Sequence, residues 1–324
     1  AEDLPYLDLG GDLFHLQPAL QSNQALAQES VSLAQVMASD NWVDLNGKTT
    51  LRGAKAENWF RVNIPGNVPG NVPGNISGNA LAGIKGSDRL TLEIANIMLD
   101  RVELYVLVNN QLKAQYTSGI HDPFSIRPIK HRKILFPLPA LRGVSGNEDT
   151  RTVYFKTTQT GITRVPIRLW SRDSFIQYEK IETLFTGLFL GATLILGIYH
   201  LLLYFRIPKL YILAYAGSIL AICCSNFLRW GYGLEYIWPN ASVHTKPVLF
   251  IIMCLASAFF ILFFIYFTGA NRSNRYTKYY FYTACYSFVA IALAIPYAKL
   301  SALIPAIIFL TLLMQCSNIF LGHL

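Results

Sequence analysis

The side chains in the first half of the chain that could carry out chemistry are four carboxylates and two histidines: Glu93, Asp100, Glu103, Asp122, His121 and His131. A glycosidase needs two carboxyl groups facing each other across a cleft, and no motif here indicates such a pair. Glu93 and Glu103 alternate with apolar residues, so we expect both on the solvent face of strands. No His-x-x-x-His pair and no Gly-x-Ser-x-Gly elbow is present. The sequence therefore predicts no catalytic residue, no metal site and no cofactor.

Three tryptophans of this half allow two interpretations. Trp42, Trp59 and Trp170 have ring faces on which a sugar could stack, but tryptophans are also common in the core of a β-sandwich. We favour burial in the core.

The charge distribution indicates a membrane protein. Charged residues make up only 14% of the 324 residues, whereas soluble domains carry about a quarter. Residues 1–175 hold 18 basic and 16 acidic side chains, and residues 176–324 hold 9 and 3. Cationic residues between apolar runs are typical of membrane helices, and a nucleic-acid partner is excluded because its basic patch would lie among polar residues.

Residues 1–175 show the pattern of an all-β domain. A short helix is predicted within 24–39, and the segments after it alternate apolar and polar residues, as strands do. These segments are 59–64, 90–94, 102–106, 111–116, 133–138, 152–157 and 165–170. Asn109-Asn110 is a hairpin turn signal, and the Pro-Gly-Asn repeat of 65–79 predicts a long loop. We expect a β-sandwich of the jelly-roll type.

Residues 176–324 contain five apolar runs long enough to cross a bilayer. The predicted spans are 183–205, 210–228, 247–268, 279–297 and 300–321. With the N-terminal domain outside, the cytoplasmic loops carry five basic residues and the outer loops three, which agrees with the positive-inside rule. His200 lies within the first span, where a packed histidine is the simpler interpretation and a relay the alternative.

The two ends of the sequence suggest a longer gene product. The chain starts at Ala1 without a basic, apolar leader, as expected after signal cleavage. It stops at Leu324 directly after an apolar run, so we expect truncation within the membrane region.

Several segments in a fixed order resemble one bacterial family. They are Asn58–Val62, Glu93–Val106 with Leu-Asp-Arg-Val at its centre, Pro123–Leu138, Gly187–Tyr204 and Tyr211–Tyr215. The chain resembles the 7TM receptors with diverse intracellular signalling modules (7TMR-DISM), in which a carbohydrate-binding-module-like jelly roll, the type-2 extracellular domain, precedes seven membrane helices. The Pro-Gly-Asn repeat and Ile207-Pro208-Lys209 depart from the family pattern.

The resemblance implies a receptor of the bacterial inner membrane with a periplasmic sensor domain. The expected partners are the lipid bilayer, a small extracellular ligand such as a carbohydrate, and a second copy in a homodimer. The expected ligand-binding residues are Trp59, Arg61, Arg101, Arg127 and His131, and Arg101 and Arg127 are also expected to tie strands together. Relatives end in histidine kinase or diguanylate cyclase modules, so enzymatic activity is expected only beyond this segment. The alternative is a transporter, or its accessory subunit, with a β-sandwich cap; the spans lack the midplane charges that ion-coupled transport uses.

Overall fold

The structure is a computed structural model. It describes residues 13–15, 21–23, 32–44, 50–51, 56–65, 90–140, 150–159, 163–164, 166–240, 244–269, 275–297, 303 and 305–307. The Pro-Gly-Asn repeat after residue 65 and most of the predicted span 300–321 lie outside these residues.

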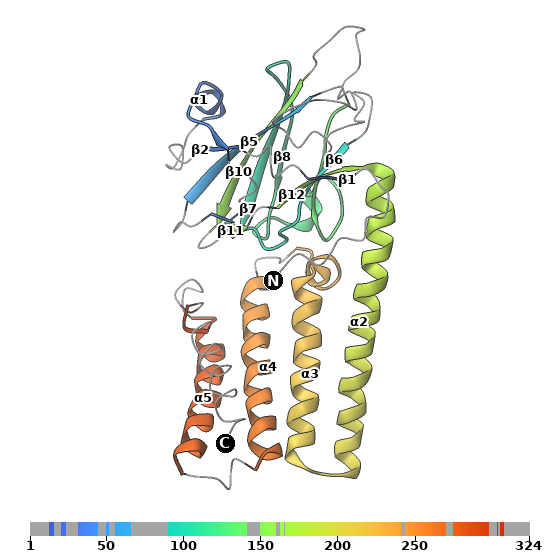
Figure 1. The fold of residues 1–324 in the computed structure, drawn as a ribbon, viewed down its shortest axis with the longest axis vertical. Coiled ribbons are helices and arrows are strands. Elements are labelled where there is room, and N and C mark those ends of the chain that lie inside the picture. Colours follow the sequence, from blue (N-terminus) through green and yellow to red (C-terminus); the bar gives the residue numbers. More distant parts are fainter. Residues whose placement is uncertain are drawn as a thin grey trace. The chain divides into compact units, whose positions relative to one another are not determined.

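A six-stranded antiparallel sheet forms one layer of the N-terminal domain (Figure 1). Its strands, in spatial order, are β3 (Val43–Asp44), β2 (Gln21–Asn23), β5 (Ala56–Pro65), β10 (Thr150–Gln159), β7 (Arg101–Val108) and β8 (Gln111–Ser118). Asn109 and Asn110 connect β7 to β8 with φ of 50° and 64°, the left-handed conformation that a tight hairpin requires. The predicted hairpin is confirmed.

A four-stranded antiparallel sheet forms the second layer, in the order β1 (Leu13–His15), β12 (Ile167–Ser171), β6 (Leu90–Ile94) and β9 (Ile134–Pro137). A separate pair joins β4 (Thr50–Leu51) to β11 (Thr163–Arg164). Within the described residues, two short helices accompany the sheets, α1 (Leu33–Met37) and the 3₁₀ turn η3 (Phe124–Ile126). The predicted β-sandwich is confirmed.

The main core lies between the two sheets, where alternate residues of both point inward. Phe60 and Phe155 stack there with ring centroids 4.7 Å apart. Trp59 and Trp170 are 2% exposed, but each occupies an outward position of its strand and lies outside this core. They are buried by helices: α1 packs over Trp59, and the start of α2 packs over Trp170. The predicted burial of Trp59 and Trp170 is confirmed, although both lie outside the core between the two sheets.

Long helices follow the sandwich: α2 (Arg172–Arg206), α3 (Leu210–Arg229), α4 (Thr245–Phe267) and α5 (Arg275–Ala294), with one π-helical segment, η4 (Gly233–Ile237). The first three are long and apolar enough to span a membrane. α2 begins at Arg172, well before the predicted start at residue 183. Its 35 residues would measure about 52 Å, more than the roughly 30 Å of a hydrocarbon core. Residues 172–182 carry five charges, so we place the membrane-spanning part after them.

The chain divides into two compact units, and the division falls within α2. Unit 1 comprises residues 1–183 together with 238–243, and unit 2 comprises the rest. The loop of unit 1 that follows η4 is held by the sandwich, because the Phe124 amide donates to the Pro239 carbonyl oxygen at 2.8 Å.

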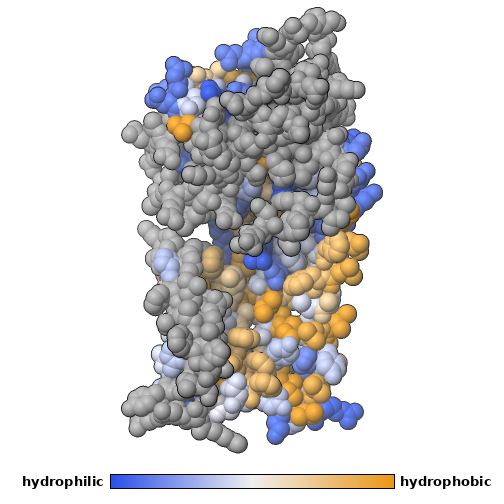
Figure 2. All heavy atoms as spheres, viewed as in Figure 1, coloured by the Kyte–Doolittle hydropathy of each residue, from blue (hydrophilic) through white to orange (hydrophobic). Residues whose placement is uncertain are grey.

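In unit 2, α3 packs on α4 and α4 packs on α5. α2 approaches α3 at Gly197, where an added Cβ would lie 2.6 Å from Leu220 Cδ2. Apolar side chains gather along α2 in Figure 2, and Leu188, Ile195 and Phe205 on this helix are largely exposed. Such a surface suits a lipid environment.

Candidate functional site

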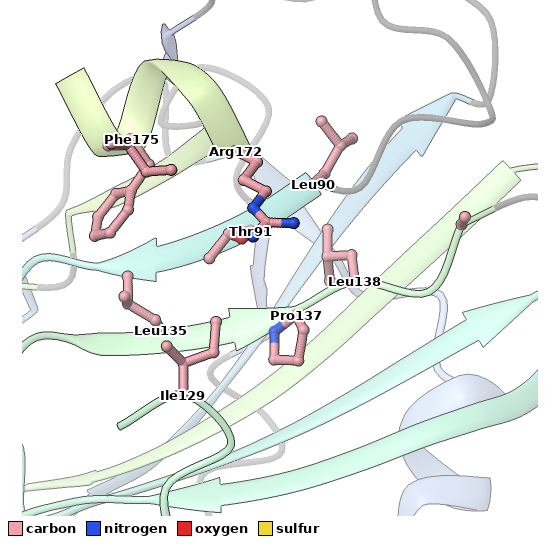
Figure 3. Close-up of a pocket in the computed structure, with 10 residues that line it drawn as sticks. Leu90, Thr91, Ile129, Leu135, Pro137, Leu138, Arg172 and Phe175 are labelled. Atoms are coloured by element: carbon pink, nitrogen blue, oxygen red, sulfur yellow. The ribbon is translucent and has the colours of Figure 1, made fainter. Parts of the chain in front are cut away.

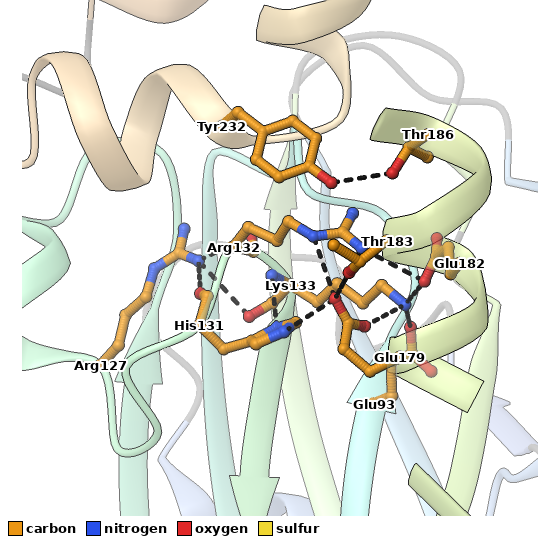
Figure 4. A network of polar contacts seen from close by, with 10 residues as sticks. All are labelled: Glu93, Arg127, His131, Arg132, Lys133, Glu179, Glu182, Thr183, Thr186 and Tyr232. Carbon is orange, nitrogen blue, oxygen red and sulfur yellow. Dashed lines mark hydrogen bonds and ion pairs between the residues drawn. The ribbon is translucent and has the colours of Figure 1, made fainter. Parts of the chain in front are cut away.

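Three consecutive basic residues face two glutamates of α2 in unit 1 (Figure 4). His131, Arg132 and Lys133 directly precede β9, whose inward residues anchor this segment to the sandwich core. Glu179 and Glu182 are three positions apart on α2, so they lie on one face of the helix. We call these five residues the ionic cluster.

The distances within the ionic cluster are those of direct ion pairs. Arg132 Nη2 lies 2.7 Å from Glu179 Oε1 and 3.3 Å from Glu182 Oε2. Lys133 Nζ lies 3.1 Å from Glu179 Oε2 and also bonds Glu182. His131 Nε2 lies 3.3 Å from Glu179 Oε1. Every basic residue of the cluster therefore contacts Glu179.

Glu93 lies beneath the ionic cluster, on β6. It is only 1% exposed, which corrects the prediction that it faces solvent. Trp170 Nε1 donates to Glu93 Oε2 at 2.5 Å, and Lys133 Nζ lies 3.7 Å from Glu93 Oε1. The carboxylate occupies the outward face of its strand as predicted, but α2 covers that face. These partners compensate the negative charge of the buried Glu93 carboxylate.

The electrostatics keep the Glu179 carboxylate and the Lys133 ammonium charged. Burial alone would raise the pKa of the Glu179 carboxyl, but the hydrogen bond from His131 and the charges of Lys133 and Arg132 hold that pKa well below its usual range. Burial alone would lower the pKa of the Lys133 ammonium, and the carboxylates of Glu93, Glu182 and Glu179 raise it instead. The ion pairs thus outweigh desolvation on both sides.

Hydrogen bonds fix the segment that carries the basic residues. The backbone amide of Lys133 donates to His131 Nδ1 at 3.1 Å, so a neutral His131 carries its proton on Nε2, facing Glu179. Arg127 is 4% exposed, and its Nη1 donates to the carbonyl oxygens of His131 at 2.9 Å and Arg132 at 3.1 Å. Arg127 therefore ties the loop before β9 together.

Aromatic rings complete the contact between β12 and α2. Trp170 packs against Tyr178, with centroids 4.8 Å apart, and against Phe175 at 5.9 Å. Lys133 Nζ lies 4.6 Å from the centroid of the Tyr178 ring. The first turns of α2 are thus held to the sheet by both charge and apolar contact.

The other expected ligand-binding residues lie on the outward face of the six-stranded sheet. Arg61 lies over Trp42, 4.8 Å from the ring centroid, and Trp59 stacks on Tyr105 at 5.9 Å. Arg101 pairs at 3.2 Å with Glu103 of its own strand, so this pair does not tie two strands. We call the surface formed by Trp42, Arg61, Arg101, Glu103 and Tyr105 the aromatic face.

The five expected residues therefore separate into two groups. Trp59, Arg61 and Arg101 belong to the aromatic face or support it, and Arg127 and His131 belong to the ionic cluster or its supporting loop. The sequence reasoning missed Glu179 and Glu182. A signal was available: they are two of only three acidic residues after position 175.

Among the residues that the structure describes, no group of three potential metal ligands is found.

Comparison with known families accounts for both halves of the chain. Residues 23–171 match 7TMR-DISM extracellular 2, and residues 182–324 match 7TM diverse intracellular signalling. The chain belongs to the 7TMR-DISM family. A search of curated proteins gave no match. The predicted resemblance is confirmed, and this 7TMR-DISM chain is a membrane signalling receptor with an extracellular domain. The ionic cluster connects the two matched regions: its basic residues lie in the first, and Glu182 is the first residue of the second.

Proposed function

We propose that this 7TMR-DISM chain is the sensing part of a receptor in a bacterial inner membrane. The sandwich lies in the periplasm and binds a small solute, with a carbohydrate as the favoured class. Binding changes the position of α2, and the helical bundle passes the change to an intracellular histidine kinase or diguanylate cyclase module encoded beyond this segment.

The ionic cluster is the observation that carries the proposal. Its basic residues belong to the sandwich, and its acidic residues belong to the helix that continues into the apolar stretch. Ligand binding changes a helix position only if the ligand favours one of two states. A network of ion pairs at the start of α2 provides contacts that one state has and the other lacks.

The aromatic face is the favoured place for the carbohydrate. Trp42 and Tyr105 present rings, and Arg61 and Arg101 present hydrogen-bond donors, a combination that suits sugar hydroxyls above an apolar platform. Trp59 is buried beneath them and supports the platform.

Ligand binding is tested with the whole chain in lipid nanodiscs and a panel of mono- and oligosaccharides, with binding followed calorimetrically. Arg61→Ala is expected to weaken the binding of the best sugar about tenfold or more, because a charged hydrogen-bond donor is lost. Lys180→Ala, which removes an exposed cation of α2, is the matched control and should bind as the parent does. Equal binding by all three proteins would remove the aromatic face from the proposal.

The relay is tested by hydrogen exchange of α2 with and without the bound sugar. Protection of residues 184–206 should change in the parent chain and not in Glu179→Gln. A sugar that binds without any change in α2 would argue against signalling. Reading the gene beyond the Leu324 codon tests the output: further spans and a kinase or cyclase domain support a receptor, whereas an immediate stop codon with solute flux in vesicles supports a transporter.

A further inference from the structure

A pocket separate from the aromatic face opens on the other side of the sandwich, against the start of α2 (Figure 3). Its volume is about 460 Å³, within the range of small-molecule sites. Strands β6 and β9 contribute Leu90 and Leu135, and the first turn of α2 contributes Phe175 and Ile176. The pocket lies wholly within unit 1.

The lining is mostly apolar and carries a single charge. Eight of the ten lining residues are apolar, and the polar ones are Thr91 and Arg172. Leu90 and Leu135 are each 2% exposed and form a buried floor, whereas Ile176 is 41% exposed at the rim. The pocket therefore has a buried apolar floor and an apolar rim that is open to solvent.

Arg172 supplies the one charge. Figure 3 shows its side chain extending from α2 over the strand that carries Leu90 and Thr91. Across the part of the chain that the structure describes, Arg172 has no carboxylate partner, and the nearby Glu93, Glu179 and Glu182 are engaged in the ionic network. Its position at the first residue of α2 adds the positive end of the helix dipole.

We propose that this pocket binds an amphipathic organic monocarboxylate, with its carboxylate on the Arg172 guanidinium and its hydrocarbon tail on Leu135, Pro137 and Phe175. A guanidinium holds a carboxylate through two parallel hydrogen bonds, which gives a strong, oriented contact. A sugar fits poorly here, because its hydroxyls would lose water against apolar walls that offer few partners. The pocket is therefore complementary to a ligand that has one negative charge and one apolar tail.

Because the pocket lies between the sheet and the start of α2, a bound ligand would affect the position of this helix. One wall belongs to the four-stranded sheet and the other to the first turn of the helix, so a bound carboxylate would contact both. We expect it to stabilise the arrangement described here, in which the ionic cluster is closed, because it would contact both walls at once. The inference goes beyond the proposed carbohydrate site and supplies the receptor with a second input.

The experiment uses the whole chain in lipid nanodiscs, with octanoate as the probe and 1-octanol as its uncharged match. Empty nanodiscs measure partition into lipid. Octanoate should bind at one saturable site, and Arg172→Gln should weaken it about tenfold or more while leaving 1-octanol unchanged, because only the charged contact is removed. Ala140→Trp, at an exposed lining position, should block both probes by filling the pocket.

Lys180→Gln is the matched control, since it removes an exposed cation of the same helix away from the pocket, and it should bind octanoate as the parent does. Octanoate binding that is equal in the parent, Arg172→Gln and Ala140→Trp, or no greater than in empty nanodiscs, would overturn the proposal. A change of oligomeric state in Ala140→Trp with unchanged octanoate binding would do the same, because the pocket would then be an interface between copies. Sugar binding is measured on the same samples, so that a failure of the carboxylate proposal can be distinguished from a failure of the carbohydrate proposal.

Discussion

At the scale of single residues, Lys133 is the most heavily engaged member of the ionic cluster. Its side chain is 5% exposed and lies near three carboxylates, those of Glu93, Glu179 and Glu182. A buried ion pair gives little net stability over an apolar pair, but removal of one partner leaves a charge without compensation. The contribution of Lys133 to stability is therefore seen only when its side chain is replaced.

Lys133→Met is expected to destabilise the sandwich by about 3 kcal/mol or more, because three carboxylates lose their shared cation. The measurement is chemical denaturation of the whole chain in nanodiscs, followed by tryptophan fluorescence. Lys113→Met, at an exposed position of β8, is the matched control and should change stability by less than about 0.5 kcal/mol. Equal effects of the two substitutions would show that the cluster adds no stability.

The Glu179 carboxyl predicts a specific acid dependence. Its pKa is lowered in the folded chain, so its ionised form stabilises the fold fully above the usual value of 4.5 and loses that contribution as pH falls toward the lower folded pKa. The difference in thermal midpoint between the parent and Glu179→Gln should therefore shrink as the pH falls below about 4.5. Lys133 stays charged throughout, because its pKa is raised above 10.5. A difference that grows in acid would contradict this assignment.

At the scale of elements, the strands were predictable because each has one face in the core. The alternation of apolar and polar residues located β6 and β7 and identified their inward-facing residues correctly. Alternation does not reveal what covers the outward face, and for that reason Glu93 was expected to face solvent and the packing of α2 over Trp170 was not predicted. The start of α2 was missed because a hydropathy window finds apolar runs, and residues 172–182 are charged.

The contact between α2 and α3 depends on the small size of one glycine. Gly197→Val should destabilise unit 2, because its Cβ would lie 2.6 Å from Leu220 Cδ2 and added methyl groups would crowd the same space. Gly191→Val is the matched control on the same helix, since no described atom lies within 4 Å of its added Cβ. Thermal unfolding in nanodiscs should show a lower midpoint for Gly197→Val by several degrees and almost none for Gly191→Val. Equal midpoints would mean that α2 does not pack on α3 through Gly197.

At the scale of the whole molecule, the topology with the sandwich outside gives a test in intact cells. The loop containing Asn240 belongs to unit 1, and Lys209 lies at the opposite end of α3. In a variant without native cysteines, a membrane-impermeant maleimide should label Asn240→Cys in intact cells and Lys209→Cys only after permeabilisation. The opposite labelling would invert the topology, and labelling of both would mean that α3 does not cross the membrane.

The uninterrupted course of α2 has a rotational consequence. An α-helix repeats about every 3.6 residues, so Glu179 and Gly197 lie about five whole turns apart and point to the same side. α2 contains no proline that would interrupt it between them. If the helix rolls about its axis as a rigid rod, the angle that carries Glu179 away from Arg132 also carries Gly197 away from Leu220. Under that condition, a turn of α2 that breaks the ionic cluster would also break the contact between Gly197 and Leu220.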